Sequence, residues 1–162
     1  MDWYVKNHSN KIGFAGRVKR LLKMFKSPSD AWLAARICAW AVSLPFLKRT
    51  ISLRILARWM WIEKKMTPSL SYEQKISTIV RWLYTFVFPQ GACVERSLIL
   101  YRYLSPIQKD ARLVTGLRKS DGIWKGHAWI VLNGRPYEEA QPAVEDFKPI
   151  MVFGPEGKSL QP

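Results

Sequence analysis

Cys93 and His127 are the residues whose types and positions could support nucleophilic catalysis. Cys93 follows a Pro-Gln-Gly-Ala turn and opens a stretch with a helical pattern of apolar residues, so we expect it in the first turn of a helix. The free amides and the positive end of the helix dipole there favour the thiolate, which is the attacking form of cysteine. His127 opens a segment of strand composition. A strand that packs across the helix start would bring its imidazole to the thiol as a base.

A carboxylate that orients the imidazole can be sought through the register of a hairpin. Asn133-Gly134 is a strong hairpin signal. If these two residues form the whole loop, Leu132 pairs with Arg135, and Glu138 shares the face of His127. Glu138 is then the candidate carboxylate.

A longer loop changes that assignment. If Leu132 joins the loop and Gly134 takes a left-handed bulge position, Val131 pairs with Arg135. His127 then lies directly opposite Glu139, which would orient and charge-stabilise the ring. We favour this bulged register and Glu139, and keep Glu138 as the alternative.

Further site residues follow from the same positions. The backbone amide of Cys93 would hold the oxyanion, with the side chain of Gln90 on the preceding turn as a further donor. Trp129 alternates onto the face of His127 and would form a wall of the substrate site. Arg96, one helical turn past Cys93, would either pair with a nearby glutamate or contact the substrate.

The other cysteine and histidine favour ordinary roles. Cys38 lies in an apolar helical stretch, so we expect it in the core, and His8 lies in a polar segment, so we expect it in solvent. The two cysteines are 55 positions apart with no paired spacing, which predicts free thiols. Because the Cys and His residues are not clustered, we expect no metal, and we expect no cofactor.

Charge and hydropathy bound the setting of the protein. The net charge is +14, and residues 1–66 hold 14 Lys and Arg against 3 Asp and Glu, a net of +11. Such a field attracts acidic peptides, acidic proteins, nucleic acid or membrane surfaces without choosing between them. The start of the chain lacks a secretory pattern, and the longest apolar run, 31–47, contains Arg36 and Pro45 and is too short to span a bilayer. We therefore expect a cytoplasmic protein.

The elements that must position the site follow from periodicity and from helix and turn signals. The first ninety residues are helical in pattern, and an antiparallel sheet follows the helix at Cys93, so the fold class is α+β. Ser29 or Asp30 would cap the second helix, Pro45 would end it, and Ser71 with Gln74 forms a capping-box pattern. The expected helices are 14–25, 31–42, 47–65, one from residue 71, and 93–103; the expected strands are 112–117 and 127–132, joined by a turn region at 119–126.

Four short stretches together carry a resemblance. They read GACVERSL at 91–98, GLR at 116–118, GHAW at 126–129 and NGRP at 133–136. In this combination the chain, from about residue 71 to 140, resembles the lasso-peptide B-protein family of transglutaminase-like leader peptidases. The family's catalytic Cys and His correspond to Cys93 and His127. Its usual Asp twelve positions after the His is Glu139 here, and an often acidic position four after the His is Val131, which are two departures.

The resemblance implies a fold, an activity and partners. It implies a helical region over residues 1–68 and a transglutaminase- or papain-like cysteine peptidase domain over 69–162. The activity implied is removal of the leader from a lasso precursor peptide, before an asparagine-synthetase-like cyclase closes the ring. Because residues 1–70 are helical in pattern, leader recognition is assigned to a separate partner protein. Nucleic acid and stable membrane insertion are not implied.

Two other classes of function remain open from the sequence. One is a basic binding or scaffold module with a vestigial triad, whose binding would be salt-sensitive and independent of Cys93. The other is a Cys-dependent acyl transferase, since an amine can resolve a thioester as water does. The mass of the product distinguishes hydrolysis from transfer.

Overall fold

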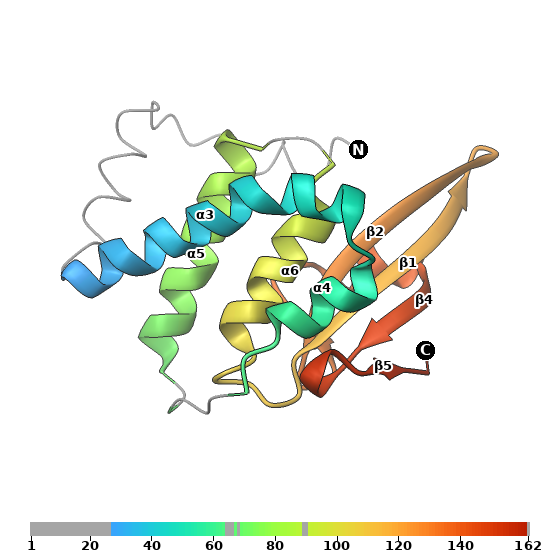
Figure 1. Cartoon of the computed structure of the whole chain (residues 1–162). Helices are drawn as coiled ribbons and strands as arrows, with labels where there is room; N and C mark the ends of the chain where they lie inside the picture. The colour runs from blue at the N-terminus through green and yellow to red at the C-terminus, as the bar shows by residue number, and fades with distance from the viewer. Residues whose placement is uncertain (1–26, 64–66, 68, 89–90, 162) are drawn as a thin grey trace. The chain divides into compact units, whose positions relative to one another are not determined.

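The computed structural model describes residues 27–63, 67, 69–88 and 91–161. Five α-helices, a 3-10 turn and five strands are described in this part of the chain (Figure 1). In chain order they are α3 (Pro28–Thr50), α4 (Leu53–Met60), α5 (Leu70–Phe86), α6 (Cys93–Leu104), β1 (Arg112–Ser120), β2 (Ile123–Leu132), β3 (Arg135–Pro136), α7 (Gln141–Glu145), β4 (Lys148–Phe153), η1 (Pro155–Gly157) and β5 (Ser159–Leu160). Helices followed by an antiparallel sheet confirm the α+β class.

The chain divides into two compact units, Met1–Ala35 and Arg36–Pro162. In the described part of the first unit, the α3 helix begins at Pro28, and the Ser27 hydroxyl accepts a hydrogen bond from the amide of Asp30. Ser27 therefore caps this helix with Pro28 in its first turn, in place of the expected Ser29 or Asp30. The expected helix at 14–25 lies outside the described residues, and the expected boundary between residues 68 and 69 stays a prediction.

Helix α3 differs from the expected helix because it continues through Pro45 to Thr50. A proline removes only its own amide from the helix ladder, and the buried face of Ile37, Ala41 and Leu44 keeps the flanking turns packed. The helix is therefore long and apolar enough, by length and composition, to cross a membrane, contrary to the expectation from its interruptions. Ile37, Ala41 and Leu44 are fully buried, but only 22% of the apolar window is buried in all. One such helix is weak evidence for a membrane span and is compatible with a soluble protein.

Helices α4 and α5 correct two further boundaries. A break after Thr50 separates α3 from α4, where one helix was expected over 47–65. Helix α5 begins at Leu70, with Ser69 at its N-cap position, so the expected capping box at Ser71 is wrong. The apolar face expected for this helix is buried as predicted.

The sheet has the strand order β3-β2-β1-β4-β5, with every neighbouring pair antiparallel. Strands β1 and β2 are longer than expected because the turn between them is reduced to Asp121 and Gly122, both with positive φ. Two residues in this conformation match the twist of the flanking strands. The expected turn at 119–126 is therefore mostly strand.

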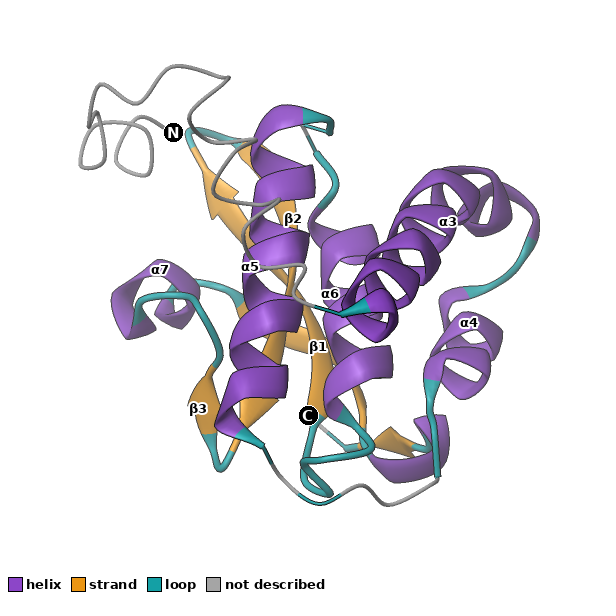
Figure 2. Cartoon of the chain, turned by 90° about the vertical axis from the view of Figure 1, so that its left-hand side faces the viewer, coloured by secondary structure: helices purple, strands orange, loops and turns teal. Residues whose placement is uncertain are grey.

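Helix α6 forms the centre of the helical layer. It packs on β1 and β2, with α5 and α4 against its sides, and Figure 2 shows α5 and α6 in front of the two strands. Leu98, Ile99 and Tyr101 of α6 are fully buried. The start of this helix is thereby held against strand β2.

Candidate active site

Cys93 lies at the first residue of α6, as the sequence predicted. Gly91 has a φ of +70°, a conformation that favours glycine, and it turns the chain into the helix. Ala92 occupies the N-cap position, and its methyl group cannot accept a hydrogen bond from the first turn. The amides of Val94 and of Ala128 on β2 hydrogen-bond to the Cys93 sulfur instead. The thiol therefore lies where helix and strand both donate to it.

His127 lies on β2 and hydrogen-bonds to the Cys93 thiol. Its ring stacks on Trp129 at 5.9 Å and 16°, and it contacts the ring of Phe147 at 5.2 Å. Trp129 is 5% exposed, so nearly all of its surface packs in the protein. The two aromatic rings fix the plane of the imidazole.

Gly116 provides the space for this packing. It pairs with His127 across the β1–β2 ladder. A Cβ atom at this position would lie 2.9 Å from the carbonyl oxygen of Lys148 and 3.0 Å from the Trp129 ring. Any larger residue would displace β4 or the rings around His127. The role of Gly116, like that of Phe147, was not predicted, although the sequence did single out the stretch around Gly116.

Glu139 contacts the imidazole through a hydrogen bond of 2.7 Å between its Oε2 and His127 Nε2. Because Nε2 is engaged in this way, Nδ1 is the ring nitrogen left for the thiol. The side chains of Cys93, His127 and Glu139 thus form a continuous chain of hydrogen bonds.

The register through which we expected this contact is wrong. Leu132 pairs with Arg135, so Asn133 and Gly134 form a plain two-residue loop, both with positive φ. The amide of Tyr137 still bonds to β2, and then Glu138 adopts a φ of +57°. This left-handed residue turns the chain out of the ladder. Glu139 reaches His127 because of that turn and not because of strand pairing.

Arg96 holds both glutamates of this segment. Its guanidinium lies 3.2 Å from Glu139 Oε1 and 3.5 Å from Glu138 Oε2, and its side chain is 18% exposed. Burial raises the pKa of Glu138, and the Arg96 and Arg81 charges oppose that effect. Of the roles expected for Arg96, the structure shows the ion pair, and a substrate contact stays a prediction.

Ser97 ties the two elements of the site together. Its buried hydroxyl donates to the carbonyl oxygen of Ala128 at 2.9 Å. Ala128 therefore bonds to α6 through both backbone groups, since its amide bonds to the Cys93 sulfur. The Arg-Ser pair that follows Cys93 in the sequence is accounted for by these contacts.

The surroundings shift the pKa values of Cys93 and His127 in opposite directions. Burial alone would raise the pKa of Cys93, but the His127 hydrogen bond and charge and the two amides outweigh it and lower that pKa. Burial alone would lower the pKa of His127, yet its bonds to Cys93 and Glu139 raise it to about 9. Both shifts favour the form of the pair in which Cys93 is a thiolate and His127 an imidazolium.

Other expected residues lie elsewhere. Gln90 and His8 are outside the described residues. Cys38 is exposed, contrary to its expected place in the core, because it lies about 100° around the helix from the buried Ile37. In the described part of the chain, no three His, Cys, Asp or Glu side chains are placed to hold a metal ion.

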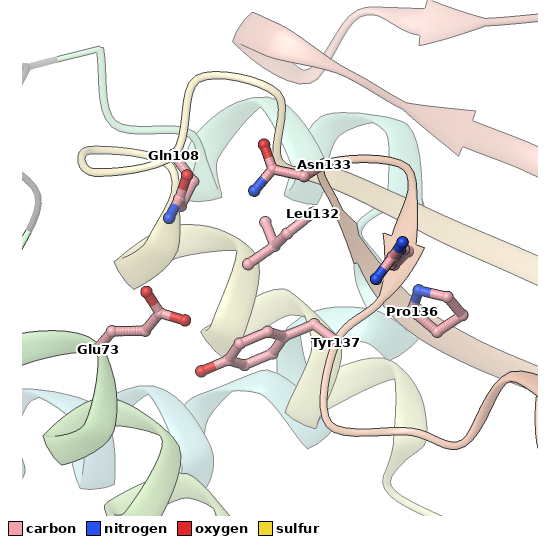
Figure 3. A pocket seen from close by; sticks show the side chains of 7 residues that line it. Glu73, Gln108, Leu132, Asn133, Pro136 and Tyr137 are labelled. Carbon is pink, nitrogen blue, oxygen red and sulfur yellow. The ribbon is translucent and has the colours of Figure 1, made fainter. Parts of the chain in front are cut away.

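A hollow of about 480 Å³ lies away from this chain of bonds. Its lining residues are Glu73, Gln108, Leu132, Asn133, Arg135, Pro136 and Tyr137. Figure 3 shows the Tyr137 ring reaching toward Glu73 of α5. Burial and the nearby Glu138 and Glu73 charges raise the pKa of Tyr137. Since the hollow includes neither Cys93 nor His127, it is separate from the candidate active site.

Comparison with protein families locates the same residues in one domain. The sequence model of the transglutaminase-like superfamily matches residues 38–152, a range that contains Cys93, His127 and Glu139. No curated protein and no solved structure matches the chain. A transglutaminase-like domain is compatible with a cysteine peptidase or with an acyl transferase. With more than half of its length covered by this match, the chain belongs to the transglutaminase-like superfamily.

Proposed function

We propose that the protein is a cysteine peptidase that removes the leader from a lasso precursor peptide. The observation that carries the peptidase proposal is the Cys93–His127–Glu139 chain of hydrogen bonds, with the pKa of the thiol lowered and that of the imidazole raised to about 9. The lasso assignment rests on the four sequence stretches around these residues.

Acylation of Cys93 is the first half of the reaction. The thiolate attacks the scissile carbonyl carbon, and a carbon–sulfur bond forms as the carbonyl oxygen becomes an oxyanion. The backbone amide of Cys93 at the uncapped start of α6 would bind that oxyanion, with Gln90 as a further expected donor. His127 gives its proton to the leaving nitrogen as the carbon–nitrogen bond breaks. A thioester on Cys93 and a free amine result.

Hydrolysis of the thioester completes the reaction. His127, now neutral, takes a proton from a water molecule, which attacks the thioester carbon. The carbon–sulfur bond breaks, a carboxylic acid leaves and gives its proton to solvent, and the thiolate–imidazolium pair is restored. Glu139 keeps the ring oriented and stabilises its positive charge in both halves. Trp129 and Phe147 hold the ring plane from the sides.

The proposed setting follows the resemblance. The chain acts in the cytoplasm with a separate leader-recognition protein, and an asparagine-synthetase-like cyclase uses the amine that cleavage frees. The substrate is then the precursor held by its leader. No cofactor takes part in the proposed reaction.

Mass spectrometry of a candidate precursor tests this function. The precursor would be incubated with the protein and a leader-binding partner, with Cys93→Ala and His127→Ala as variants and Cys38→Ala as the matched cysteine control. We expect wild type and Cys38→Ala to release a leader fragment with one added water, and the other two variants to release none.

Two other results would replace the proposal. A heavier conjugate in place of fragments would assign the acyl transferase function. An intact precursor with every protein, while the partner is shown to bind the leader, would support the binding module.

A further inference from the structure

Strand β2 has an open outer edge beside the candidate active site. On that side β3 pairs only with Val131 and Leu132, and the Tyr137 amide adds a bond to Ile130. Among the described residues, no strand pairs with residues 123–129 on this edge. His127 is part of this unpaired stretch.

The turn at Asp121 and Gly122 decides which backbone groups face the open edge. In a two-residue hairpin the two residues that flank the loop form a hydrogen-bonded pair, and these residues are Ser120 and Ile123 here. Along the ladder, hydrogen-bonded pairs then alternate with pairs that exchange no hydrogen bond. Odd-numbered residues of β2 therefore bond to β1, while the amides and carbonyls of even-numbered residues point outward. The bond between Tyr137 and the carbonyl of Ile130 at the far end agrees with this parity.

Three even-numbered residues then matter next to the site. Both outward backbone groups of Ala128 are already bonded to α6. Its amide donates to the Cys93 sulfur, and its carbonyl oxygen accepts from the Ser97 hydroxyl. The next outward groups along the edge belong to Gly126 and Trp124. Because a strand rises about 3.3 Å per residue, Trp124 lies about 10 Å along the strand from His127. This row of donors and acceptors leads directly from the thiol.

The side chains of this stretch set its chemistry. Beyond Leu117, β4 no longer pairs with β1, so the hairpin continues as a two-stranded arm (Figure 1). The exposed Lys125 shares the face of His127. On the other face Trp124 is 65% exposed, and the ammonium of Lys119 lies 5.9 Å from its ring centre. Lys125 thus makes one face of the edge cationic, and the other face presents the Trp124 ring with the Lys119 ammonium beside it.

We propose that this edge binds an extended segment of the polypeptide substrate as an added strand. Its backbone bonds to Gly126 and Trp124, an acidic side chain lies beside Lys125, and an apolar side chain lies on Trp124. The occupant is a substrate segment because the row of backbone groups is continuous with the thiol and because the charge of Lys125 selects acidic residues. The inference rests on the proposed function and names how the substrate is held.

Binding to the catalytically blocked protein tests the inference apart from cleavage. The probe is a fluorescein-labelled synthetic peptide of alternating Glu and Val residues, titrated by anisotropy into full-length Cys93→Ala protein. Two versions of the peptide carry N-methyl groups on alternate, complementary sets of backbone amides. Since a bound strand turns every second amide toward its neighbour, we expect one set to weaken binding about tenfold or more and the other to weaken it less.

Proline at Gly126 tests the same bond from the protein side. The Gly126 amide points outward, so Gly126→Pro removes that donor without removing a β1–β2 bond. Gly126→Ala is the matched control, since its Cβ would meet Leu117 at an ordinary 3.5 Å and the amide remains. We expect about tenfold weaker binding for the proline variant than for the alanine variant, with equal melting temperatures. Lys125→Glu should reverse the preference for this peptide over one of alternating Lys and Val.

Several results would overturn strand addition. They are equal effects of the two N-methylated sets, equal binding by Gly126→Pro and Gly126→Ala, or no binding of the peptide at all. If the peptide binds with the expected alternation but wild-type protein never cleaves a precursor, strand addition stands and the peptidase proposal fails. The experiment with the N-methylated peptides uses Cys93→Ala protein without any change at Gly126, so the test remains valid even if Gly126→Pro does not fold.

Discussion

The two cysteines of the chain lie on two different helices, and their pKa values are shifted in opposite directions. Cys38 is in the middle of α3 on its exposed side, and burial by its neighbours raises its pKa. Cys93 is at the start of α6, where His127 and two amides outweigh burial and lower the pKa. Desolvation acts in the same direction at both thiols. The direction of each pKa shift is therefore set by the groups that donate to the sulfur, since both residues are cysteines.

Removing each thiol should give the largest contrast between the two regions. We expect Cys93→Ala to lose at least about 10³-fold in the rate of precursor cleavage, because the nucleophile is gone. Cys38→Ala should retain the rate within about twofold, as expected for an exposed residue away from the site. Initial rates measured by liquid chromatography check both. A large loss in Cys38→Ala alone would reverse the comparison.

Removing the charge on Glu139 should bring the pKa of His127 closer to its ordinary value. Glu139→Gln removes interactions that raise the pKa of His127 to about 9, so that pKa should fall toward its ordinary 6.5. The alkaline limb of the cleavage profile should move down, and the rate at neutral pH should fall by about 10- to 100-fold.

Glu138→Gln is the matched control for that variant. It should leave the alkaline limb in place and cost only a few-fold in rate, because no bond from Glu138 reaches the imidazole. A larger shift in Glu138→Gln than in Glu139→Gln would assign the orienting role to Glu138. The pH dependence of the cleavage rate, measured for both variants, decides between the two carboxylates.

Alkylation should separate the two cysteines without any substrate. At pH 7 we expect iodoacetamide to modify Cys93 at least about tenfold faster than Cys38, because the thiolate is the reacting form. The more exposed thiol should thus react more slowly. Peptide mass spectrometry after timed quenching gives both rates, with His127→Ala as the control in which the difference shrinks. Faster modification of Cys38 would contradict the pKa directions.

The ion pairs of Arg96 should contribute to the free energy of unfolding. Arg96→Gln removes the guanidinium that two largely buried carboxylates share, and we expect a loss of about 2 kcal/mol in the free energy of unfolding. Lys158→Ala, which removes an exposed pair with Glu156, should cost less than about 0.5 kcal/mol. Urea denaturation at pH 7 measures both, and equal losses would show that burial of the Arg96 pairs adds nothing.

The pH dependence of stability follows from His127. Its pKa is raised from 6.5 to about 9 on folding, so its contribution is complete below pH 6.5 and is lost as the pH rises through about 9. Urea midpoints of wild type and His127→Ala should therefore differ more at pH 6 than at pH 10. A constant difference across this range would contradict the raised pKa.

The parts of the fold that depend on local pattern could be predicted. Helix α6 beginning at Cys93 and the buried face of α5 follow from helical periodicity, and the strands flanking Asn133-Gly134 follow from composition and turn chemistry. The continuation of α3 through Pro45 could not be predicted, because a local breaker was outweighed by packing of Ile37, Ala41 and Leu44. Cys38 was misplaced for a different reason, since its apolar surroundings in the sequence do not say which face of the helix is buried.

For the candidate site, the sequence by itself determined the nucleophile and base candidates, because the helix start at Cys93 and the strand composition around His127 are local features. The expectation that His127 opens its strand was wrong, since β2 begins at Ile123. Only the tertiary structure decided which glutamate meets the imidazole. The left-handed conformation of Glu138 turns Glu139 toward His127, and the Arg96 ion pairs hold this segment to a helix more than forty residues earlier. The tertiary structure also decided the directions of the pKa shifts, because these depend on desolvation and on hydrogen-bond partners. It decided the open edge of β2 as well, because that edge depends on which strands pair, and local sequence pattern does not specify strand pairing.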